Sequence, residues 1–444
     1  MTDLASVILA AGHGTRMRSR TPKVLHEVAG LPMLGHVLRA ADALGAARQV
    51  VVTGAQAPQV ADAARTLAPD VRLAVQDPPR GTADAVTAAM GSLEGFEGHV
   101  IVLYADTPLV TPATLEAMRA ALAGGADLVV LGFEPDAPRL YGRLLTDEAG
   151  RLTAIREARE ASPDELAVRL CNSGVMAMAS AALREHLPRV TNDNAKGEFY
   201  LTDLVELIVR AGGRAAVVVG DEDEVIGVDD RTQLACAEAI WQDRARRDAM
   251  LAGVTLRDPA TTYLSHDTAL GEDVVVGPGV VFGPGVTVEA GARIEAFCHL
   301  EGCVVRAGAS VGPYARLRPG TDLGEGAKVG NFVEVKKARL GPGAKASHLT
   351  YLGDAEVGAG ANIGAGTITC NYDGYNKHVT RIGEGAFVGS NSSLVAPVEI
   401  GPGAYVGSGS VVTKDVAPDA LAVSRARQSV IEGWAAKFRS RKEG

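Results

Sequence analysis

Three groups of residues in this 444-residue chain have types and spacing that could do chemistry. The first is a glycine-rich loop, Gly12-His13-Gly14-Thr15-Arg16, which directly follows an apolar run, Leu4 to Ala11, that predicts a buried strand. Backbone amides in such a loop can approach a phosphate without interference from a Cβ atom, and Arg16 adds a rigid positive fork. The loop lacks the Gly-Lys-Ser/Thr of a Walker A loop and the third glycine of a dinucleotide fingerprint. Taken alone, it is equally typical of a plain strand-to-helix turn.

The second group consists of Asp106 and the residues that follow it. Asp106 follows a second predicted strand, His99 to Tyr104, and precedes Thr107-Pro108. A carboxylate at this position could cap the next helix or turn. It could also bind Mg²⁺, which keeps most of its waters and needs only one or two carboxylates beside substrate phosphates. The residue alone leaves both roles open.

The third group is polar and lies in the second half of the chain, around His348. A neutral imidazole can take the proton from an attacking amine when a neighbouring group fixes its tautomer. Arg318 and Lys336 could hold a sugar phosphate, while Tyr351 and Asn362 could bind sugar hydroxyls. A lone histidine is usually structural, so the prediction depends on the whole set.

The third group lies in a stretch, from about Val276 to Val412, where an aliphatic residue returns every sixth position for most of the length. This step is neither a helix period nor a strand period, and it is typical of a parallel β-helix of hexapeptide repeats. Its tight corners require glycine or proline, which Gly-Pro-Gly segments supply at matching phase. A glycine-rich linker is the alternative, but linkers do not space aliphatic residues regularly. The step breaks at Ala365 to Arg381, where we expect a loop outside the β-helix.

Upstream of the repeats, apolar runs alternate with helical patterns, which predicts a mostly parallel sheet covered by helices on both faces. Ligands would then bind at the carboxyl ends of the strands. We expect added β-structure over Leu140 to Ala158 and Val168 to Met178, and one long helix over Arg231 to Leu251. The other expected strands are 49–53, 71–76, 128–133 and 215–219, and the other expected helices are 34–44, 58–67, 82–90, 112–122, 181–187 and 202–210.

Composition narrows the class of protein. Hydrophobic residues make up 47% of the chain, enough for large cores, and the aromatic content of 4% suits a narrow β-helix filled by small side chains. A net charge of -9 argues against a general nucleic-acid surface. The five cysteines lack metal-ligand spacing. With no signal peptide and no apolar run long enough to span a bilayer, we expect a cytoplasmic protein.

The run Leu9-Ala10-Ala11-Gly12-His13-Gly14-Thr15-Arg16-Met17, together with Pro22-Lys23-Val24-Leu25, resembles the nucleotide-binding signature of sugar-phosphate nucleotidyltransferases. The resemblance implies that Lys23 neutralises a phosphate and that Gln76 and Gly81-Thr82 select uracil. The substrate-binding residues that it implies are Leu9, Ala10, Ala11, Gly12, Lys23, Gln76, Gly81, Thr82, Tyr104, Ala105, Asp106, Gly142, Glu157, Asn172 and Asp229.

The same resemblance implies that Asp106 and Asp229 are the Mg²⁺ ligands. Asp229 stands where the family usually has asparagine, and Ala105 where it commonly has glycine. A second carboxylate should hold the cation more tightly but also repels the phosphates, so its net effect stays open. The implied reaction is in-line attack of a sugar-1-phosphate oxygen on the α-phosphate of UTP, with Mg²⁺, Arg16 and Lys23 stabilising the charge.

With the second half included, nearly the whole chain resembles the bacterial bifunctional N-acetylglucosamine-1-phosphate uridyltransferase/glucosamine-1-phosphate acetyltransferase family. The resemblance implies that His348 is the general base and that Glu334 supports the substrate amine. Ser347 stands where the family often has glycine. Arg318, Lys336, Tyr351 and Asn362 would bind the sugar phosphate. The implied acetyl-CoA residues are Ala365, Asn371, Tyr372, Ser390, Ser408 and Arg425.

That family implies an α/β Rossmann-like nucleotidyltransferase domain (1–228), a linker helix (229–252), a left-handed parallel β-helix acetyltransferase domain (253–424) and a basic tail (425–444). It also implies a homotrimer, with the acetyl site built from neighbouring β-helices. The expected enzyme acetylates glucosamine-1-phosphate with acetyl-CoA. It then transfers UMP from UTP to N-acetylglucosamine-1-phosphate, giving UDP-N-acetylglucosamine and pyrophosphate for peptidoglycan and other cell-envelope synthesis. Neither nucleic acid nor a membrane is an expected partner.

Two other interpretations compete with this one. The β-helix could be only a structural or regulatory oligomerisation element, but a scaffold has no need of the polar set around His348. The chain could also be a non-catalytic assembly protein that keeps both folds. Arg16, Lys23 and Asp106 argue against that, while Asp229 leaves it some room.

Overall fold

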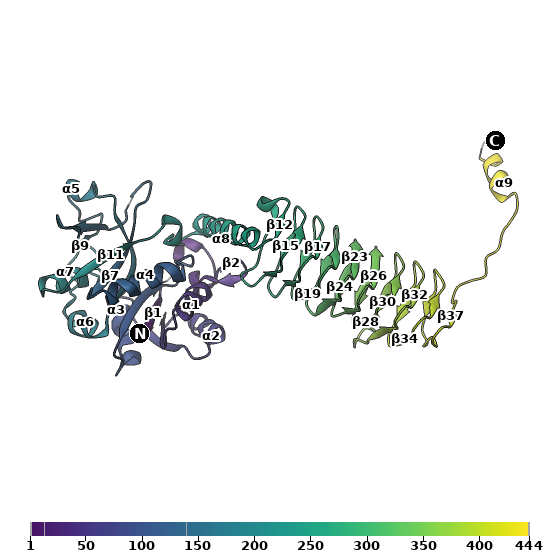
Figure 1. Cartoon of the computed structure of the whole chain (residues 1–444), viewed down its shortest axis with the longest axis horizontal. Coiled ribbons are helices and arrows are strands. Elements are labelled where there is room, and N and C mark those ends of the chain that lie inside the picture. Colours follow the sequence, from purple (N-terminus) through teal and green to yellow (C-terminus); the bar gives the residue numbers. More distant parts are fainter. Residues whose placement is uncertain (1, 13, 139, 443–444) are drawn as a thin grey trace. The chain divides into compact units, whose positions relative to one another are not determined.

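The computed structural model describes residues 2–12, 14–138 and 140–442 (Figure 1). The chain divides into two compact units, Met1–Asp243 and Arg244–Gly444. Helix α8 (Arg231–Leu251) runs through the boundary and has the bounds that the sequence predicted. Its uninterrupted length follows from the absence of glycine and proline, the two residues that weaken a helix interior most.

A nine-stranded sheet forms the centre of the first unit, in the order β5-β4-β1-β6-β10-β7-β11-β9-β8. Strands β1, β4, β5 and β6 are mutually parallel, but β10 runs antiparallel between β6 and β7. The predicted sheet is therefore mixed, because the added β-structure joins it. The strands are β1 (Leu4–Ala10), β4 (Arg48–Gly54), β5 (Arg72–Gln76), β6 (His99–Tyr104), β7 (Leu128–Phe133), β8 (Arg143–Thr146), β9 (Leu152–Arg156), β10 (Cys171–Ala179) and β11 (Ala215–Val219).

Helices cover both faces of this sheet, as the alternating pattern predicted. One buried cluster joins Leu34, Val60 and Leu115 to alternate residues of the strands, and a second cluster on the opposite face contains Val86 and Leu204. Each fully buried aliphatic side chain stabilises the fold by about 1.5–3 kcal/mol. The helices are α1 (Met33–Ala43), α2 (Pro58–Leu67), α3 (Thr82–Ala89), α4 (Pro112–Ala123), α5 (Pro163–Leu166), α6 (Ser180–His186) and α7 (Asp203–Arg210); a small pair of strands, β2 (Glu27–Val28) and β3 (Leu31–Pro32), stands apart from the sheet.

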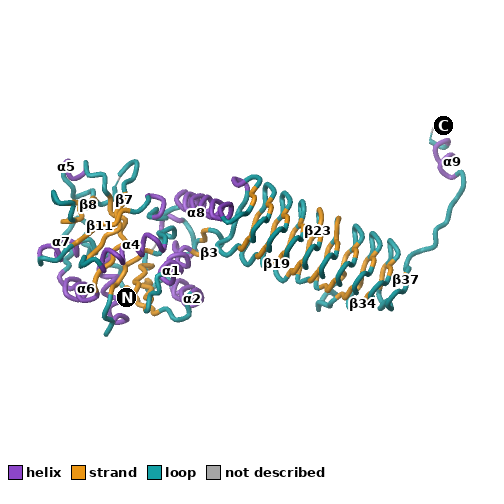
Figure 2. Tube along the Cα trace, in the orientation of Figure 1, coloured by secondary structure: helices purple, strands orange, loops and turns teal. Residues whose placement is uncertain are grey.

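The second unit is a left-handed parallel β-helix, whose short strands repeat coil after coil in Figure 2. Three parallel sheets of ten, eight and eight strands form its faces. The aliphatic residue of each hexapeptide points inward and is buried, as at Val276, Ile294 and Leu317. The first face contains β12 (Thr255–Leu256), β14 (Val275–Val276), β17 (Arg293–Ile294), β20 (Ser310–Val311), β23 (Lys328–Asn331), β26 (Lys345–His348), β29 (Asn362–Ile363), β32 (Phe387–Val388), β35 (Tyr405–Val406) and β37 (Leu421–Ala422).

The other two faces carry the remaining strands of the coils. The second face contains β15 (Val281–Phe282), β18 (His299–Leu300), β21 (Arg316–Leu317), β24 (Glu334–Lys336), β27 (Tyr351–Gly353), β30 (Ile368–Cys370), β33 (Ser393–Val395) and β36 (Val411–Val412). The third face contains β13 (Ala269–Leu270), β16 (Thr287–Val288), β19 (Cys303–Val305), β22 (Thr321–Leu323), β25 (Arg339–Leu340), β28 (Ala355–Val357), β31 (Thr380–Ile382) and β34 (Val398–Ile400). After the last coil, the chain ends in a short helix, α9 (Trp434–Ser440).

The predicted break at Ala365 was placed too early. Strand β30 continues the second face, and Thr369 takes the inward position with 2% exposure. Its hydroxyl donates to the Gly353 carbonyl at 3.0 Å, which satisfies a buried polar group that the aliphatic pattern could not reveal. The loop that leaves the β-helix therefore begins only after Cys370, and we call it the protruding loop.

Candidate functional site

The glycine-rich loop lies where β1 ends, and a 3₁₀ turn (Thr15–Met17) follows it. Gly14 has φ +57°, and a Cβ atom at this position would lie 2.5 Å from the Cβ of Lys23. Glycine is therefore required here chiefly because Lys23 packs against the loop. No Cβ contact limits Gly12, which lines a cavity with Ala11. His13 lies outside the described residues.

Two segments far apart in the sequence bring the predicted metal ligands together. Asp106 follows β6, and its carbonyl accepts a hydrogen bond from the Val228 amide at 2.9 Å, which holds the next residue, Asp229, close by. Gln233, in the first turn of α8, accepts from the Asp229 amide at 2.8 Å. The two carboxylates thus face one another from the sheet and from the start of the long helix.

The ammonium group of Lys23 lies between these two carboxylates. It donates to Asp106 Oδ2 and, at 3.0 Å, to Asp229 Oδ1, which also accepts from Arg16 Nη2 at 2.9 Å. Burial lowers the pKa of Lys23, but the two carboxylates outweigh burial and raise it overall. Since one cation contacts both side chains, the donor set fits a small oxygen-seeking cation such as Mg²⁺.

The predicted base-reading residues lie at the carboxyl ends of β4 and β5, beside a cavity of about 300 Å³. Gln76 lines it and is 5% exposed. Its amide nitrogen donates to the Gly81 carbonyl (2.9 Å) and to Asp84 Oδ2 (2.8 Å), so the amide oxygen is the atom of this group that could accept from a ligand. Gly81 has φ +119°, and a Cβ there would come within 2.4 Å of the Phe199 carbonyl. Thr82 accepts from the Leu201 amide at 2.9 Å, which makes its role partly structural.

The predicted sugar-binding residues also form one group. The Asn172 amide donates to the Gly142 carbonyl at 2.8 Å, and Glu157 Oε1 would lie 3.5 Å from a Cβ on Gly142. Burial raises the pKa of Glu157 and, with the charge of Asp106, that of Tyr104. Ala105 is fully buried and donates its amide to the Leu9 carbonyl at 3.1 Å. The structure therefore assembles the implied phosphate, base and sugar residues along one edge of the sheet.

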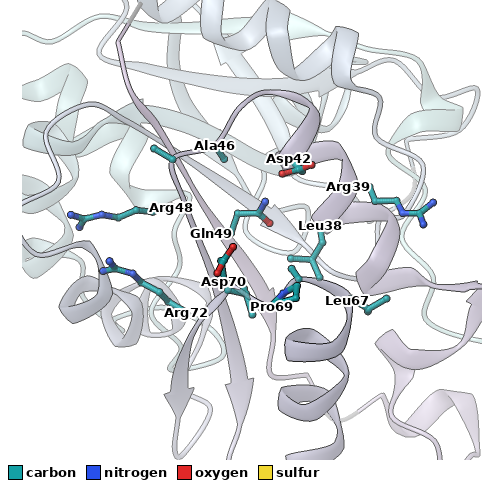
Figure 3. A pocket seen from close by; sticks show the side chains of 13 residues that line it. Leu38, Arg39, Asp42, Ala46, Arg48, Gln49, Leu67, Pro69, Asp70 and Arg72 are labelled. Atoms are coloured by element: carbon teal, nitrogen blue, oxygen red, sulfur yellow. The ribbon is translucent and has the colours of Figure 1, made fainter.

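A larger cavity, of about 510 Å³, lies at the opposite edge of the same sheet (Figure 3). It is lined by the amino ends of β4 and β5 and the carboxyl ends of α1 and α2. Two of its arginines are engaged elsewhere, because Arg48 donates to the Glu94 carbonyl and Arg72 to the Ser92 carbonyl. None of the residues implied by the sequence lines it, so the types of residue, and not the size of the cavity, make the other edge the candidate site.

On the β-helix, four predicted residues share the second face. Arg318 Nη1 donates to Glu334 Oε1 at 2.8 Å, and Glu334 is the register partner of Tyr351 on the next coil. Lys336 ends the same strand, β24. The sequence did not single out Lys377, whose ammonium, above all, lowers the pKa of Lys336. Arg318, Lys336 and Lys377 together form a cationic cluster that suits a phosphate.

The predicted general base lies at the corner between the first and second faces. His348 Nδ1 is 2.6 Å from Asn331 Oδ1, one coil earlier, at a separation of 17 residues. Because an amide oxygen only accepts, Nδ1 carries the proton and Nε2 keeps its lone pair. Asn331 was not predicted, although counting back one coil from His348 reaches it.

Three implied acetyl-CoA residues continue this corner in a column. Backbone hydrogen bonds connect each coil to the next at this corner. The His348 carbonyl accepts from the Gly366 amide at 3.4 Å, and the Ala365 carbonyl accepts from the Asn391 backbone amide at 2.7 Å. The Ser390 carbonyl accepts from the Gly409 amide at 2.8 Å. Ala365, Ser390 and Ser408 therefore follow His348 coil by coil.

The other implied residues lie outside this column. Asn371 is 7% exposed and donates to Asp354 at the base of the protruding loop, while Tyr372 is exposed on it. Arg425 directly follows Ser424, whose amide donates to Ser410 Oγ at 3.1 Å at the end of the β-helix. Asn362 begins β29 on the first face, paired with Lys345 and Phe387. One chain therefore does not bring Asn362 beside Arg318 and Lys336.

Two kinds of structure are absent from the described residues. Within residues 2–12, 14–138 and 140–442, no helix is long and apolar enough to cross a membrane. No group of three or more histidine, cysteine or acidic side chains that could hold a metal occurs in that same part of the chain.

The fold and these sites define a nucleotidyltransferase joined to a hexapeptide-repeat transferase. A model of the MobA-like NTP transferase domain matches residues 6–194, and a model of the bacterial transferase hexapeptide (six repeats) matches residues 380–414. Curated relatives match the whole length. Bifunctional protein GlmU of Azorhizobium caulinodans is 58% identical to this chain, and the match covers 99% of this chain and 98% of the relative. The proteins of the same name from Paramagnetospirillum magneticum and Maricaulis maris are 54% and 56% identical. Each of these two matches covers 99% of this chain and 97% of the relative.

The chain belongs to the GlmU family. It is a bifunctional enzyme, a UDP-N-acetylglucosamine pyrophosphorylase and glucosamine-1-phosphate N-acetyltransferase, as the resemblance implied. The interpretation of the β-helix as a scaffold alone is thereby excluded.

Proposed function

We propose that UMP transfer takes place at the edge where β1, β5 and β6 end, with Mg²⁺ bound by Asp106 and Asp229. The observation that carries this assignment is the convergence of both carboxylates on a single cation, the Lys23 ammonium. When bound, the metal would neutralise charge on the phosphates of UTP. In this chain, Arg16 and Lys23 bind the phosphates, Gln76 reads the uracil, and Gly142, Glu157 and Asn172 orient the acetamido sugar. Catalysis then depends on positioning and charge stabilisation, without a protein nucleophile.

At the second site we propose that Nε2 of His348 is the general base. The amine of glucosamine-1-phosphate attacks the acetyl thioester, the C–N bond forms, and the proton of the amine passes to Nε2 as the CoA thiolate leaves. Asn331 holds the imidazole in the required tautomer by accepting from Nδ1 at 2.6 Å. Arg318 and Lys336 bind the phosphate, and Glu334 orients the amine. Asn371, Tyr372 and the column from Ala365 to Ser408 hold acetyl-CoA.

We propose that the enzyme is a homotrimer and that each acetyl site is shared between chains. The corner beside His348 carries a ladder of exposed apolar residues, Phe297, Tyr314, Phe332 and Leu349, each 50–62% exposed. Consecutive rings stack at 5.0 and 5.3 Å, and all four residues have positive φ, which bulky residues rarely adopt. An apolar ladder of this kind favours burial against a second copy. A neighbouring β-helix would supply the Asn362 that one chain keeps on a separate face.

Mixing two inactive variants tests the shared site. His348→Ala and Asn362→Ala should each lose acetyl transfer. Unfolding and refolding them together should restore activity to about a quarter of the sites, through random assembly of chains. Refolding each alone is the control. If the mixture stays inactive although mixed trimers form, His348 and Asn362 do not serve one intermolecular site.

The substrates and the cysteines favour the cytoplasm as the place of action. UTP and acetyl-CoA are supplied there, and all five cysteines are free thiols. Burial raises the pKa of Cys298 to about 11 and that of Cys303 to about 12, so both are unreactive core residues.

A further inference from the structure

Lys23 is buried more deeply than the two carboxylates that it contacts. Its side chain is 9% exposed, whereas those of Asp106 and Asp229 are 26% and 31% exposed. A buried ammonium is stable only when it is paired, and here both partners are carboxylates. In turn, two carboxylates held this close would repel each other without a cation between them. The three side chains therefore form one unit in which each charge depends on the others.

The backbone around Lys23 builds this position. Lys23 begins the 3₁₀ turn Lys23–Leu25, and Gly14 packs so closely that any Cβ there would meet the lysine. Asp106 and Asp229 are themselves fixed by the Val228 and Gln233 hydrogen bonds. The lysine is thus held against the carboxylates by the fold on both sides.

We propose that the Lys23 ammonium holds the cation position between Asp106 and Asp229 until the metal arrives, and that Mg²⁺ binds by displacing it. The displaced side chain then turns toward the phosphates of UTP. This inference rests on the proposed metal and nucleotide site, and adds to it an exchange of one cation for another.

The two cations exclude each other for a simple reason. Mg²⁺ would bond to the same carboxylate oxygens that Lys23 contacts, including Asp229 Oδ1. A divalent and a monovalent cation sharing these oxygens would repel strongly in a partly buried site. The lysine therefore competes with free metal, whereas metal accompanied by triphosphate offers the ammonium a new anionic partner. Such an exchange makes metal binding without nucleotide weak and couples metal entry to substrate.

Metal affinity without nucleotide tests the exchange. We would titrate the full-length protein with Mn²⁺, as a spectroscopic probe for Mg²⁺, and follow free Mn²⁺ by electron paramagnetic resonance. Lys23→Met removes the competing charge at nearly the same volume and should bind Mn²⁺ about tenfold more tightly than the unmodified chain. Gly14→Ala should act in the same direction, because its Cβ displaces Lys23 without altering either carboxylate.

Arg18→Gln is the control for the general effect of removing one positive charge, since Arg18 directly follows the 3₁₀ turn Thr15–Met17 and is exposed. Its Mn²⁺ affinity should change by less than about twofold. A second readout is thermal unfolding. Without metal, Lys23→Met should have a lower melting temperature than the unmodified chain, because its two carboxylates repel each other. Adding Mg²⁺ should raise the melting temperature of Lys23→Met by more than it raises that of the unmodified chain.

Unchanged or weaker Mn²⁺ binding by folded Lys23→Met would overturn the exchange, as would equal tightening in Arg18→Gln. Asp106→Asn separates this failure from failure of the proposed site. If it still binds Mn²⁺ as the unmodified chain does, the metal assignment itself is wrong. If it loses binding while Lys23→Met is unchanged, only the exchange is wrong.

Discussion

At the scale of single residues, the two sites share no side chain. Lys23, Asp106 and Asp229 belong to the first unit, while His348 and Asn331 belong to the second. The first site depends on the charge of an ammonium paired with two carboxylates, and the second on the free lone pair of an imidazole with one fixed tautomer. A side chain of similar size alone replaces neither.

Single substitutions should therefore separate the activities. Asp106→Ala should reduce UDP-sugar formation by at least about 10³-fold, because the metal site loses a ligand, and should leave acetyl transfer unchanged. His348→Ala should reduce acetyl transfer by about 10²–10⁴-fold and spare UMP transfer. Assays of both products with each purified variant check this. Loss of both activities from one substitution in a folded oligomer would contradict independent sites.

Asp203 offers a test through pH. Burial, followed by repulsion from Glu206, Glu160 and Glu157, raises its pKa to about 6, and Arg156 offsets only part of this. The folded state therefore holds the proton more tightly than the unfolded state, so stability falls as pH rises from about 4 to about 6. Asp203→Asn should remove that penalty and stabilise the protein by about 1–2 kcal/mol at pH 8, after allowance for partial exposure.

Urea denaturation of both proteins at pH 4.5 and pH 8 provides the measurement. The increase in the free energy of unfolding caused by Asp203→Asn should be small at pH 4.5 and larger at pH 8. A gain that does not depend on pH would show that Asp203 is ionised normally in the folded protein.

At the scale of elements, the coils of the β-helix approach each other so closely that some positions tolerate no side chain. A Cβ atom on Gly330 would lie 1.9 Å from the Ser347 carbonyl oxygen. Strands β23 and β26 meet there, and they carry Asn331 and His348. The same close approach of two coils therefore positions Asn331 and His348, the residues of the proposed acetyl site.

Gly330→Ala should destabilise the β-helix by about 3 kcal/mol, because a backbone must move. It should also lower acetyl transfer while UMP transfer persists. Gly326→Ala is the matched control, since its Cβ meets no atom within 4 Å and only its φ of +64° opposes alanine. We expect a cost of about 1 kcal/mol there. Equal unfolding midpoints for the two variants would contradict the close approach at Gly330.

Much of the element structure follows from the sequence because it is periodic. The sixfold aliphatic step predicted the β-helix, and strands such as His99–Tyr104 and Leu128–Phe133 have the predicted bounds. The start of the protruding loop was missed because Thr369 is a polar residue in an inward position, satisfied by a backbone carbonyl. The sequence did not predict that β10 pairs antiparallel with both β6 and β7, because strand pairing depends on long-range contacts and not on a local pattern.

For the candidate sites, the sequence likewise predicted the residues but not the contacts between them. Types and motifs predicted Lys23, Asp106 and His348, but not that Lys23 bridges the two carboxylates or that Asn331 fixes the imidazole. Those contacts depend on which coils and strand ends meet in space. Lys377 was missed because it lies in an irregular loop, where no repeat marks its position.

At the scale of the whole molecule, the exposed ladder of Phe297, Tyr314, Phe332 and Leu349 would link oligomer formation to catalysis in the proposed homotrimer. The ladder is next to His348, so the same corner would carry both an interface and a reaction site. Tyr314→Ser should weaken the proposed trimer and lower acetyl transfer in parallel, with UMP transfer kept.

Sedimentation of the purified variant at several concentrations checks the assembly. Tyr375→Ser is the control, because this tyrosine is 91% exposed on the protruding loop and away from the ladder. A stable trimer in Tyr314→Ser, with both activities intact, would place the interface elsewhere.

The most direct test of two independent catalytic units is release of CoA in the absence of UTP. Purified protein would be mixed with glucosamine-1-phosphate and acetyl-CoA, and free thiol followed with time. We predict steady release by the unmodified chain and by Asp106→Ala, and release about 10²–10⁴-fold slower by His348→Ala. Undiminished release by His348→Ala, or loss of release in Asp106→Ala while the oligomer stays folded, would contradict two independent catalytic units.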